Sequence, residues 1–338
     1  MPFEYLCYFY DYKSIGMGFA DCRLKMALRQ FWFRTFASCG ALVASGAAQD
    51  ARIEQARQVQ VLAQDPKVDT PGRATAESPS TPISGEDWES FGVQQLLRDQ
   101  ERLRYFRVAP EFSAFRTSNV ALTRVDPRAD SFFLAIFPLE YRRPLGGSFQ
   151  IEAAVRYAAF RYGRFPELNF NSVDAGLGLT YQAAAFGGFT TFVRYNFNQL
   201  MNAQSGDPFF QNHTVTLGAQ KVFVFSQAHY AYVGLSGQIA FSDPLSAERS
   251  EISGFAGYHL QATRKLEADL LWRSAKYLYS EGGREDFNHT VSLALRYRFT
   301  ECLSLFGSSY ATKNSSNNSI FDYEAVNAGG GLSLSLEF

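Results

Sequence analysis

The sequence predicts an all-β protein: a transmembrane, antiparallel, up-and-down β-barrel of about twelve strands that occupies residues 105–338. Three observations lead to this prediction. Apolar and polar residues alternate with a period of two along most of this region, which sends successive side chains to opposite faces of a strand. Long and short connections alternate between these segments along the chain. The chain also has 32 Phe and 18 Tyr but a mean hydropathy of −0.18, as strands with one apolar and one polar face would give.

The charge and composition exclude several other classes of protein. The 32 Lys and Arg residues balance 33 Asp and Glu residues, for a formal net charge of −1. A nucleic-acid-binding protein would need an excess of positive charge to neutralise phosphates, so no nucleic-acid partner is expected. The chain is 46% hydrophobic, which is too apolar for a largely disordered protein.

Residues 1–48 are expected to precede the mature protein. Residues 26–48 have the pattern of a secretory signal peptide, in which positive charge precedes an apolar stretch and small residues follow, with cleavage near Gln49. The apolar stretch is too short to cross a bilayer core of about 30 Å as a helix. All cysteines except Cys302 lie before this cleavage point, so neither a disulfide framework nor a cysteine metal site is expected.

Residues 49–104 are predicted to form a periplasmic linker and a short helix. Residues 49–63 are polar and helix-prone, and residues 64–85 are rich in Pro, Ser, Thr and charge, which is typical of a flexible linker. Ser84 can cap a helix over about 86–104. This helix is interpreted as a solvated element before the barrel, or alternatively as a plug or an assembly element.

The segments after residue 104 have about the nine to eleven residues that a strand needs to cross a membrane at a tilt. In residues 290–299, for example, Val, Leu, Tyr and Phe alternate with Thr, Ser, Ala and Arg. Pro110 and Pro138 lack the N–H that a strand ladder requires, so a bulge or an early strand end is expected at each. The predicted strands are 105–117, 131–142, 148–161, 170–182, 189–199, 210–225, 229–241, 251–262, 265–279, 287–300, 303–312 and 325–338.

The lengths of the connections between these strands distinguish the two ends of the predicted barrel. Bacterial outer-membrane barrels have long outer loops, tight periplasmic turns and an even number of strands. The alternation of long and short connections therefore predicts a closed barrel in the bacterial outer membrane, surrounded by its lipid, with both chain termini in the periplasm. The long connections are 118–130, 162–169, 200–209, 242–250, 280–286 and 313–324.

Charged residues on the polar strand face are predicted to line the lumen. A charge that faced lipid near the membrane midplane would cost about 2–4 kcal/mol, so inward placement is favoured. Opposed Arg and carboxylate groups could bias the passage of solutes by charge and size, or could fill the lumen as an ion-pair network that does not conduct. The candidates are Glu111, Glu152, Arg156, Asp174, Arg194, Glu267, Asp269, Arg273, Arg296 and Arg298.

The C-terminal half resembles a known group of outer-membrane proteins. The stretches 290–293 and 296–297, followed by 315–317 and Tyr323, are similar to the β-barrel porin-2 group over roughly residues 210–338. This resemblance implies a barrel of porin-like character and brings no defined substrate, cofactor or catalytic motif. The last strand also resembles the C-terminal signature that the barrel-assembly machinery of Gram-negative bacteria recognises, here Leu332, Leu334, Leu336 and Phe338.

The sequence offers no catalytic or metal-binding constellation. Barrel phospholipases resemble one another through a His and a Ser two residues apart on one strand face, whereas His289 and Ser292 are three apart and on opposite faces. No metal-ligand spacing or phosphate-binding glycine loop appears in the mature chain. We therefore expect a porin-like passive channel for small solutes, without enzyme activity, metal or cofactor. The alternatives are a non-conducting surface barrel with a structural, adhesion or binding role and, less favoured, a lipid-modifying enzyme.

Overall fold

The structure is a computed structural model that describes residues 49–60, 105–183 and 188–338, all within one compact unit. These residues contain a helix at 49–60, fourteen strand segments and, in the connections, short 3-10 helices such as η3 (Leu245–Ala247). The strand segments are β1 (Phe106–Val108), β2 (Glu111–Thr117), β3 (Asp130–Gly146), β4 (Phe149–Tyr162), β5 (Phe170–Ala183), β6 (Phe189–Asn202), β7 (Pro208–Ser226), β8 (His229–Asp243), β9 (Arg249–Gln261), β10 (Leu266–Tyr279), β11 (Glu285–Arg298), β12 (Leu303–Ser316), β13 (Tyr323–Leu334) and β14 (Leu336–Glu337).

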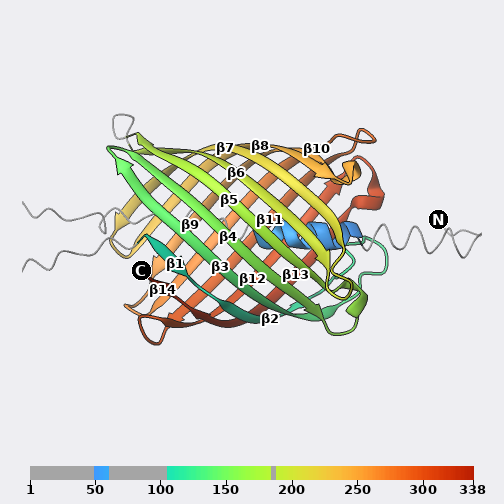
Figure 1. Cartoon of the computed structure of the whole chain (residues 1–338), viewed down its shortest axis with the longest axis horizontal. Coiled ribbons are helices and arrows are strands. Elements are labelled where there is room, and N and C mark those ends of the chain that lie inside the picture. Colours follow the sequence, from blue (N-terminus) through green and yellow to red (C-terminus); the bar gives the residue numbers. More distant parts are fainter. Residues whose placement is uncertain (1–48, 61–104, 184–187) are drawn as a thin grey trace, which may run out of the picture. The chain divides into compact units, whose positions relative to one another are not determined.

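The strand segments make one closed antiparallel barrel (Figure 1). The segments β1 and β2 form one interrupted barrel strand, as do β13 and β14, and each barrel strand pairs with the next along the chain. The fourteen segments therefore make twelve barrel strands. The first and last of these pair through β1–β14 and β2–β13, which closes the sheet. The predicted fold class is confirmed, and the predicted strands agree with the observed ones to within a few residues.

The two prolines at which a bulge or an early strand end was expected have different effects. The interruption between β1 and β2 contains Pro110, as expected, and the Pro110 carbonyl accepts a hydrogen bond from the Leu334 N–H (3.0 Å). Pro138 was also expected to end or bend its strand, but β3 continues through it to Gly146. The Pro138 carbonyl still accepts from the Ala109 N–H (3.4 Å), and the N–H that Pro138 lacks falls opposite the existing interruption.

The two faces of the sheet differ in chemistry. Large apolar side chains alternate along the outer face and are exposed there, for example Val155, Leu217 and Leu235. Polar side chains such as Asn198 and Asn212 occupy the inner face and are buried. Such a closed sheet suits lipid, where every backbone N–H and C=O has to be paired within the protein. Within the described residues, no helix has the length and apolar character needed to span a membrane.

The two ends of the barrel differ in their connections. At the long-loop end the connections are residues 118–129, 163–169, 203–207, 244–248, 280–284 and 317–322. At the short-turn end, on the left of Figure 1, β3 and β4 are joined by two residues, as are β7 and β8. Several strands reach further into the connections than predicted, so the contrast in length is smaller than the sequence suggested. Tyr105 and Phe338 meet at the short-turn end, where the Tyr105 N–H donates to the Phe338 carbonyl (2.8 Å).

Candidate functional site

The helix 49–60 lies inside the barrel at the long-loop end, where Figure 1 draws it in blue. Its polar side chains donate to backbone carbonyls of the surrounding loops: Gln55 Nε2 to Val120 (2.7 Å) and Arg57 Nη2 to Ala247 (2.7 Å). At the start of the helix, Gln49 Nε2 donates to the Phe209 carbonyl (2.9 Å) at the beginning of β7. The helix therefore fills the mouth of the lumen at the long-loop end. This position differs from the periplasmic placement expected for residues 49–104; the second helix expected at 86–104 lies outside the described residues.

One side of the helix is apolar and packs against an apolar part of the barrel interior. Ile53 and Ala56 are buried in a cluster contributed mainly by the inner faces of β3 to β7. In this cluster the rings of Phe160 and Phe170 stack with their centroids 4.2 Å apart, and both side chains are fully buried. The apolar contact fixes which side of the helix faces these strands.

The other side of the helix is held by a buried ion pair. Glu54 Oε2 accepts from Arg249 Nη1 at 2.7 Å, and Arg249 also donates to the Tyr279 hydroxyl (3.0 Å). The Tyr323 hydroxyl donates to Glu54 Oε1 (3.4 Å) and accepts from Gln58 Nε2 (3.3 Å). The polar side of the helix is thereby matched to β9, β10 and β13, so both sides of the helix have a complementary wall.

The charges on the helix depend on their buried surroundings. Burial tends to raise the pKa of Glu54, but the charges of Arg249 and Arg57, with the hydrogen bond from Arg249, hold it below its ordinary value. Burial, together with repulsion from Arg249, lowers the pKa of Arg57 to about 10 despite the attraction of Glu54. Both groups are therefore charged at neutral pH.

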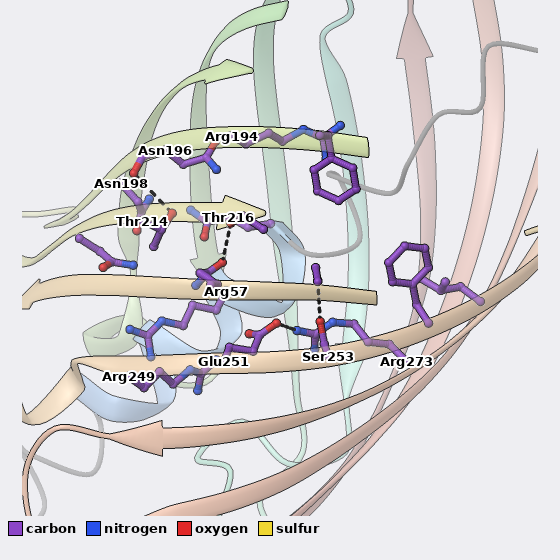
Figure 2. A pocket seen from close by; sticks show the side chains of 17 residues that line it. Arg57, Arg194, Asn196, Asn198, Thr214, Thr216, Arg249, Glu251, Ser253 and Arg273 are labelled. Carbon is purple, nitrogen blue, oxygen red and sulfur yellow. Dashed lines mark hydrogen bonds and ion pairs between the residues drawn. The ribbon is translucent and has the colours of Figure 1, made fainter. Parts of the chain in front are cut away.

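A cavity of about 130 Å³ lies next to the end of the helix, among β6 to β10 (Figure 2). Four arginines line it, one from the helix and three from strands: Arg57, Arg194, Arg249 and Arg273. Neutral amides and hydroxyls from β6 to β9 form much of the remaining wall, together with two phenylalanine rings: Asn196, Asn198, Asn212, Thr214, Thr216, Ser236, Gln238, Ser253, Phe192 and Phe255. Among the described residues that line the cavity, Glu251 is the one acidic residue.

Two of the cavity arginines pair with carboxylates of the wall. Arg273 forms an ion pair with Glu251, and its other nitrogen donates to the Tyr277 hydroxyl (3.3 Å). Arg194 Nε donates to Glu152 Oε1 at 2.5 Å. These contacts hold the guanidinium groups in place around the cavity.

Five of the ten lumen residues predicted from the sequence lie at or beside this cavity. Arg194 and Arg273 line it, and Glu152 is the ion-pair partner of Arg194. Asp174 accepts from Gln60 of the helix and from Asn198 Nδ2 (2.9 Å), and Arg156 stands opposite Asp174 in the pairing of β4 with β5.

The other five predicted residues form a separate group towards the short-turn end. Arg296 lies between two carboxylates, 3.8 Å from Glu111 and 3.5 Å from Glu267, and Arg298 Nη2 is 3.5 Å from Glu267. Asp269 Oδ1 lies 2.6 Å from His259 Nδ1. The predicted set is thus divided between two networks rather than joined in one.

The predicted C-terminal signature lies on the last barrel strand. Its four residues are all exposed: Leu332, Leu334, Leu336 and Phe338. Recognition of this strand by an assembly machinery stays a prediction.

Sequence reasoning missed the residues that join the helix to the barrel. Glu54 and Arg57 belong to a segment assigned to the periplasm, and Arg249 was placed in the predicted connection 242–250. The strand β9 begins earlier, at Arg249. Extending the period-two pattern back from Ser253 through Glu251 to Arg249 would have put all three on the inner face.

Comparison with known proteins shows likeness in fold only. No family model and no curated protein matches the chain, so the resemblance to the porin-2 group is not confirmed. The outer membrane channel COG4313 of Pseudomonas putida F1 is 11% identical, with a TM-score of 0.48 over 71% of this chain and 98% of that chain. The translocator domain of the autotransporter NalP from Neisseria meningitidis is 11% identical (TM-score 0.40, 70% and 90% covered). The KdgM porin in complex with disordered oligogalacturonate is 9% identical (TM-score 0.39, 68% and 99% covered). These proteins are outer-membrane β-barrels.

Proposed function

We propose that this protein is a porin-like passive channel of the bacterial outer membrane that carries small polar solutes. The observation that supports this proposal is a polar, charged cavity inside a closed barrel whose outer surface is apolar. A membrane-spanning barrel requires the closed sheet and the apolar surface, and a solute path requires the polar interior. In the usual orientation of such barrels, the long-loop end faces outward and the short-turn end faces the periplasm.

The helix 49–60 is proposed to close the outer mouth of this channel. It fills the mouth with its apolar side on the Phe160 cluster and its polar side on Arg249. Solutes would therefore pass when the helix is displaced, and displacement has to break the buried, charge-assisted contact between Glu54 and Arg249. With signal cleavage near Gln49, as the sequence predicts, the mature chain would begin at the first residue of this helix.

Planar-bilayer recordings would test the channel and its closure together. The refolded full chain is expected to conduct weakly, and a variant that lacks residues 49–60 is expected to conduct several-fold more, because the mouth is then open. Heat-modifiable mobility in gel electrophoresis would establish that each barrel is folded. If neither protein conducts, the channel proposal is wrong.

A non-conducting surface barrel is the second candidate, and the tight filling of the mouth favours it. The helix buries polar residues such as Gln55, Arg57 and Gln58 against partners in the barrel. A barrel with a purely structural or binding role would need no displacement of this helix. It predicts that deletion of residues 49–60 destabilises the barrel and leaves the conductance at background.

We also propose that the protein is not an enzyme. The His259–Asp269 contact has part of the geometry of a catalytic triad. Among the described residues, however, His259 has no hydrogen bond to a serine, and the Tyr230 ring stacks on the imidazole with centroids 4.8 Å apart. Hydrolysis of phospholipid by the purified barrel, abolished by His259→Ala, would overturn this proposal.

A further inference from the structure

We propose that the cavity beside the helix is a binding site for a small hydroxylated carboxylate, of the size and chemistry of a sugar acid. This inference rests on the proposed channel for the solute's access and goes further by naming the solute class. Three features of the cavity lead to it: its charge, its neutral lining and the contribution of the helix.

The charge of the cavity is positive. Of the charged side chains among the described lining residues, four are positive and one, Glu251, is negative: Arg57, Arg194, Arg249 and Arg273 against Glu251. Glu54 and Glu152, the partners of Arg249 and Arg194, compensate two of the arginines, and Glu251 compensates Arg273. Among the described residues, one positive charge remains after these three carboxylates are counted. The carboxylate of Asp174, beside the cavity, is balanced by Arg156 opposite it in the pairing of β4 with β5.

This excess charge is assigned to Arg57, which is attracted by Glu54 and Asp50 but has no direct ion pair with a described carboxylate. Its side chain is buried, and it donates to the Ala247 carbonyl at 2.7 Å. Among the described residues no carboxylate lies within ion-pair distance of it, although every other cavity arginine has one. A buried guanidinium remains charged and is costly without a counter-charge in direct contact, so a ligand carboxylate in the cavity would supply the ion pair that the described residues do not.

The neutral lining suits the hydroxyl groups of such a ligand. Side-chain amides and hydroxyls of β6 to β9, such as Asn196, Asn198 and Thr214, provide both donors and acceptors (Figure 2). The rings of Phe192 and Phe255 add apolar faces to the same wall. The volume of about 130 Å³ is roughly tenfold what a single water requires, which leaves room for a small organic molecule.

The acidic groups of the wall make a cation a poor alternative ligand. Glu251 is buried and already paired with Arg273, and Glu152 is paired with Arg194. A cation would have to compete with these guanidinium groups at each carboxylate, whereas an anion meets Arg57 without breaking an ion pair. The site therefore selects by charge as well as by hydroxyl content.

The helix is itself part of the site. Arg57 and Gln60 come from the helix, and the other lining residues come from the barrel wall. A bound carboxylate would therefore contact helix and wall together and would favour the position of the helix in the lumen. Ligand affinity and helix position are coupled by the same free energy, because each stabilises the other.

Calorimetric titration of the refolded full chain in detergent would test the site with two matched probes. D-glucuronate and D-glucose share a ring and differ in the carboxylate, so glucuronate is expected to bind at least about tenfold more tightly, as one charge-assisted hydrogen bond would provide. Arg57→Gln should remove this difference, and Arg57→Lys should retain part of it because the positive charge remains. Arg52→Gln is the matched control: Arg52 lies on the same helix over the Phe209 ring and does not line the cavity.

The outcomes separate the site from the channel. Binding of glucuronate that Arg57→Gln removes and Arg52→Gln preserves supports the site, whether or not the barrel conducts. Equal affinities for glucuronate and glucose, no binding of either, or equal losses in Arg57→Gln and Arg52→Gln would overturn it. Conductance without glucuronate binding would support the channel proposal and contradict the binding site. Glucuronate binding without conductance would support the binding site and contradict the channel proposal. Heat-modifiable mobility of each variant shows that the barrel is folded.

Discussion

The two halves of the lumen are built by the same strands and yet differ in how their charges are held. In the long-loop half, the side chains of Arg249 and Glu54 are 6% and 14% exposed and lie 2.7 Å apart. In the short-turn half, those of Arg298 and Glu267 are 42% and 21% exposed and lie 3.5 Å apart. The difference arises because the helix excludes water from one half, whereas no described element fills the other. An identical alternation of inner and outer residues therefore produces a packed interior at one end and a solvated one at the other.

This contrast decides which ion pairs matter for stability. Solvated pairs contribute about 0–1 kcal/mol, because water screens them and their side chains lose freedom on pairing. Removing one partner of a buried pair costs about 3–5 kcal/mol, because the other charge is left without a counter-charge. The two halves of the lumen should therefore respond very differently to the same substitution.

The largest effect is expected from Arg249→Gln, which leaves Glu54 buried and unpaired. We expect the docking of the helix to weaken by about 3 kcal/mol or more. Trypsin cleaves after arginine and can reach Arg52 and Arg57 only when the helix leaves the lumen, so cleavage should accelerate by about a hundredfold in the folded barrel.

The matched control for this prediction is Arg298→Gln in the short-turn half. It removes the same charge from a solvated pair far from the helix, so the rate of trypsin cleavage should stay at that of the unsubstituted protein. If Arg298→Gln accelerated cleavage as much as Arg249→Gln, the two halves would not differ as described.

A smaller effect is expected from Gly234→Ala, which tests how far the packed half extends along β8. A Cβ at Gly234 would overlap the ring of Phe255, a wall of the cavity, and would lie 2.8 Å from the Ala219 carbonyl oxygen. Overpacking of this kind costs about 1–3 kcal/mol. We expect the temperature at which the barrel unfolds, followed by heat-modifiable mobility, to fall.

Gly237→Ala on the same strand is the control for this substitution. The nearest atom to a Cβ at Gly237 is the Glu251 carbonyl oxygen at 4.0 Å, so the same added methyl meets open space. Equal unfolding temperatures for the two variants would show that the interior near Phe255 is loose rather than packed.

The smallest effect is expected from acidification, which acts on the helix through Glu54. Docking favours the ionised carboxyl, whose pKa lies below its ordinary value of 4.5 because Arg249 and Arg57 outweigh the effect of burial. This stabilisation is complete above pH 4.5 and is lost as the pH falls through the lower pKa of the docked state. Conductance is therefore expected to rise below pH 4.5, with up to about 1.4 kcal/mol of docking free energy lost per pH unit in that window.

The Glu54→Gln variant tests whether Glu54, rather than another carboxyl group, causes the rise in conductance at low pH. Burial raises the pKa of Asp50, so protonation of Asp50 is easier in the docked state and acts in the opposite direction. The Glu54→Gln variant should lack the rise in conductance at low pH that Glu54 causes. A variant that kept the full rise would assign it to other groups.

The strands could be predicted from the sequence because the information for them is local. Residues of opposite polarity alternate within each strand, so the inner position of Arg194 or Arg273 follows from counting by two. The location of the helix 49–60 is not local information. Gln55 and Gln58 are polar, and a helix with polar residues around it is expected in solvent unless partners are known. Those partners, Val120 and Tyr323, lie 65 and 265 residues away.

The pairing within the lumen was also beyond the sequence. Ten inner charges were identified, but which Arg meets which carboxylate depends on register and on side-chain reach across neighbouring strands. Arg194 crosses from β6 to Glu152 on β4, which no pattern within one strand predicts. Glu251 was absent from the predicted set because its strand was started two residues too late to show the alternation with Arg249.

The seam of the barrel bears on the order in which the molecule can be assembled. The first and last strands pair at this seam, with Arg107 opposite Glu337 and Val108 opposite Leu336. The cylinder thus cannot close until the final strand is in place, and the helix precedes the first strand in the chain. A helix enclosed by a continuous sheet cannot pass through the wall, so it must be inside when the seam forms or enter afterwards through an open end. The topology therefore links the entry of the helix into the lumen to the closure of the barrel wall, because one of these two steps has to come before the other.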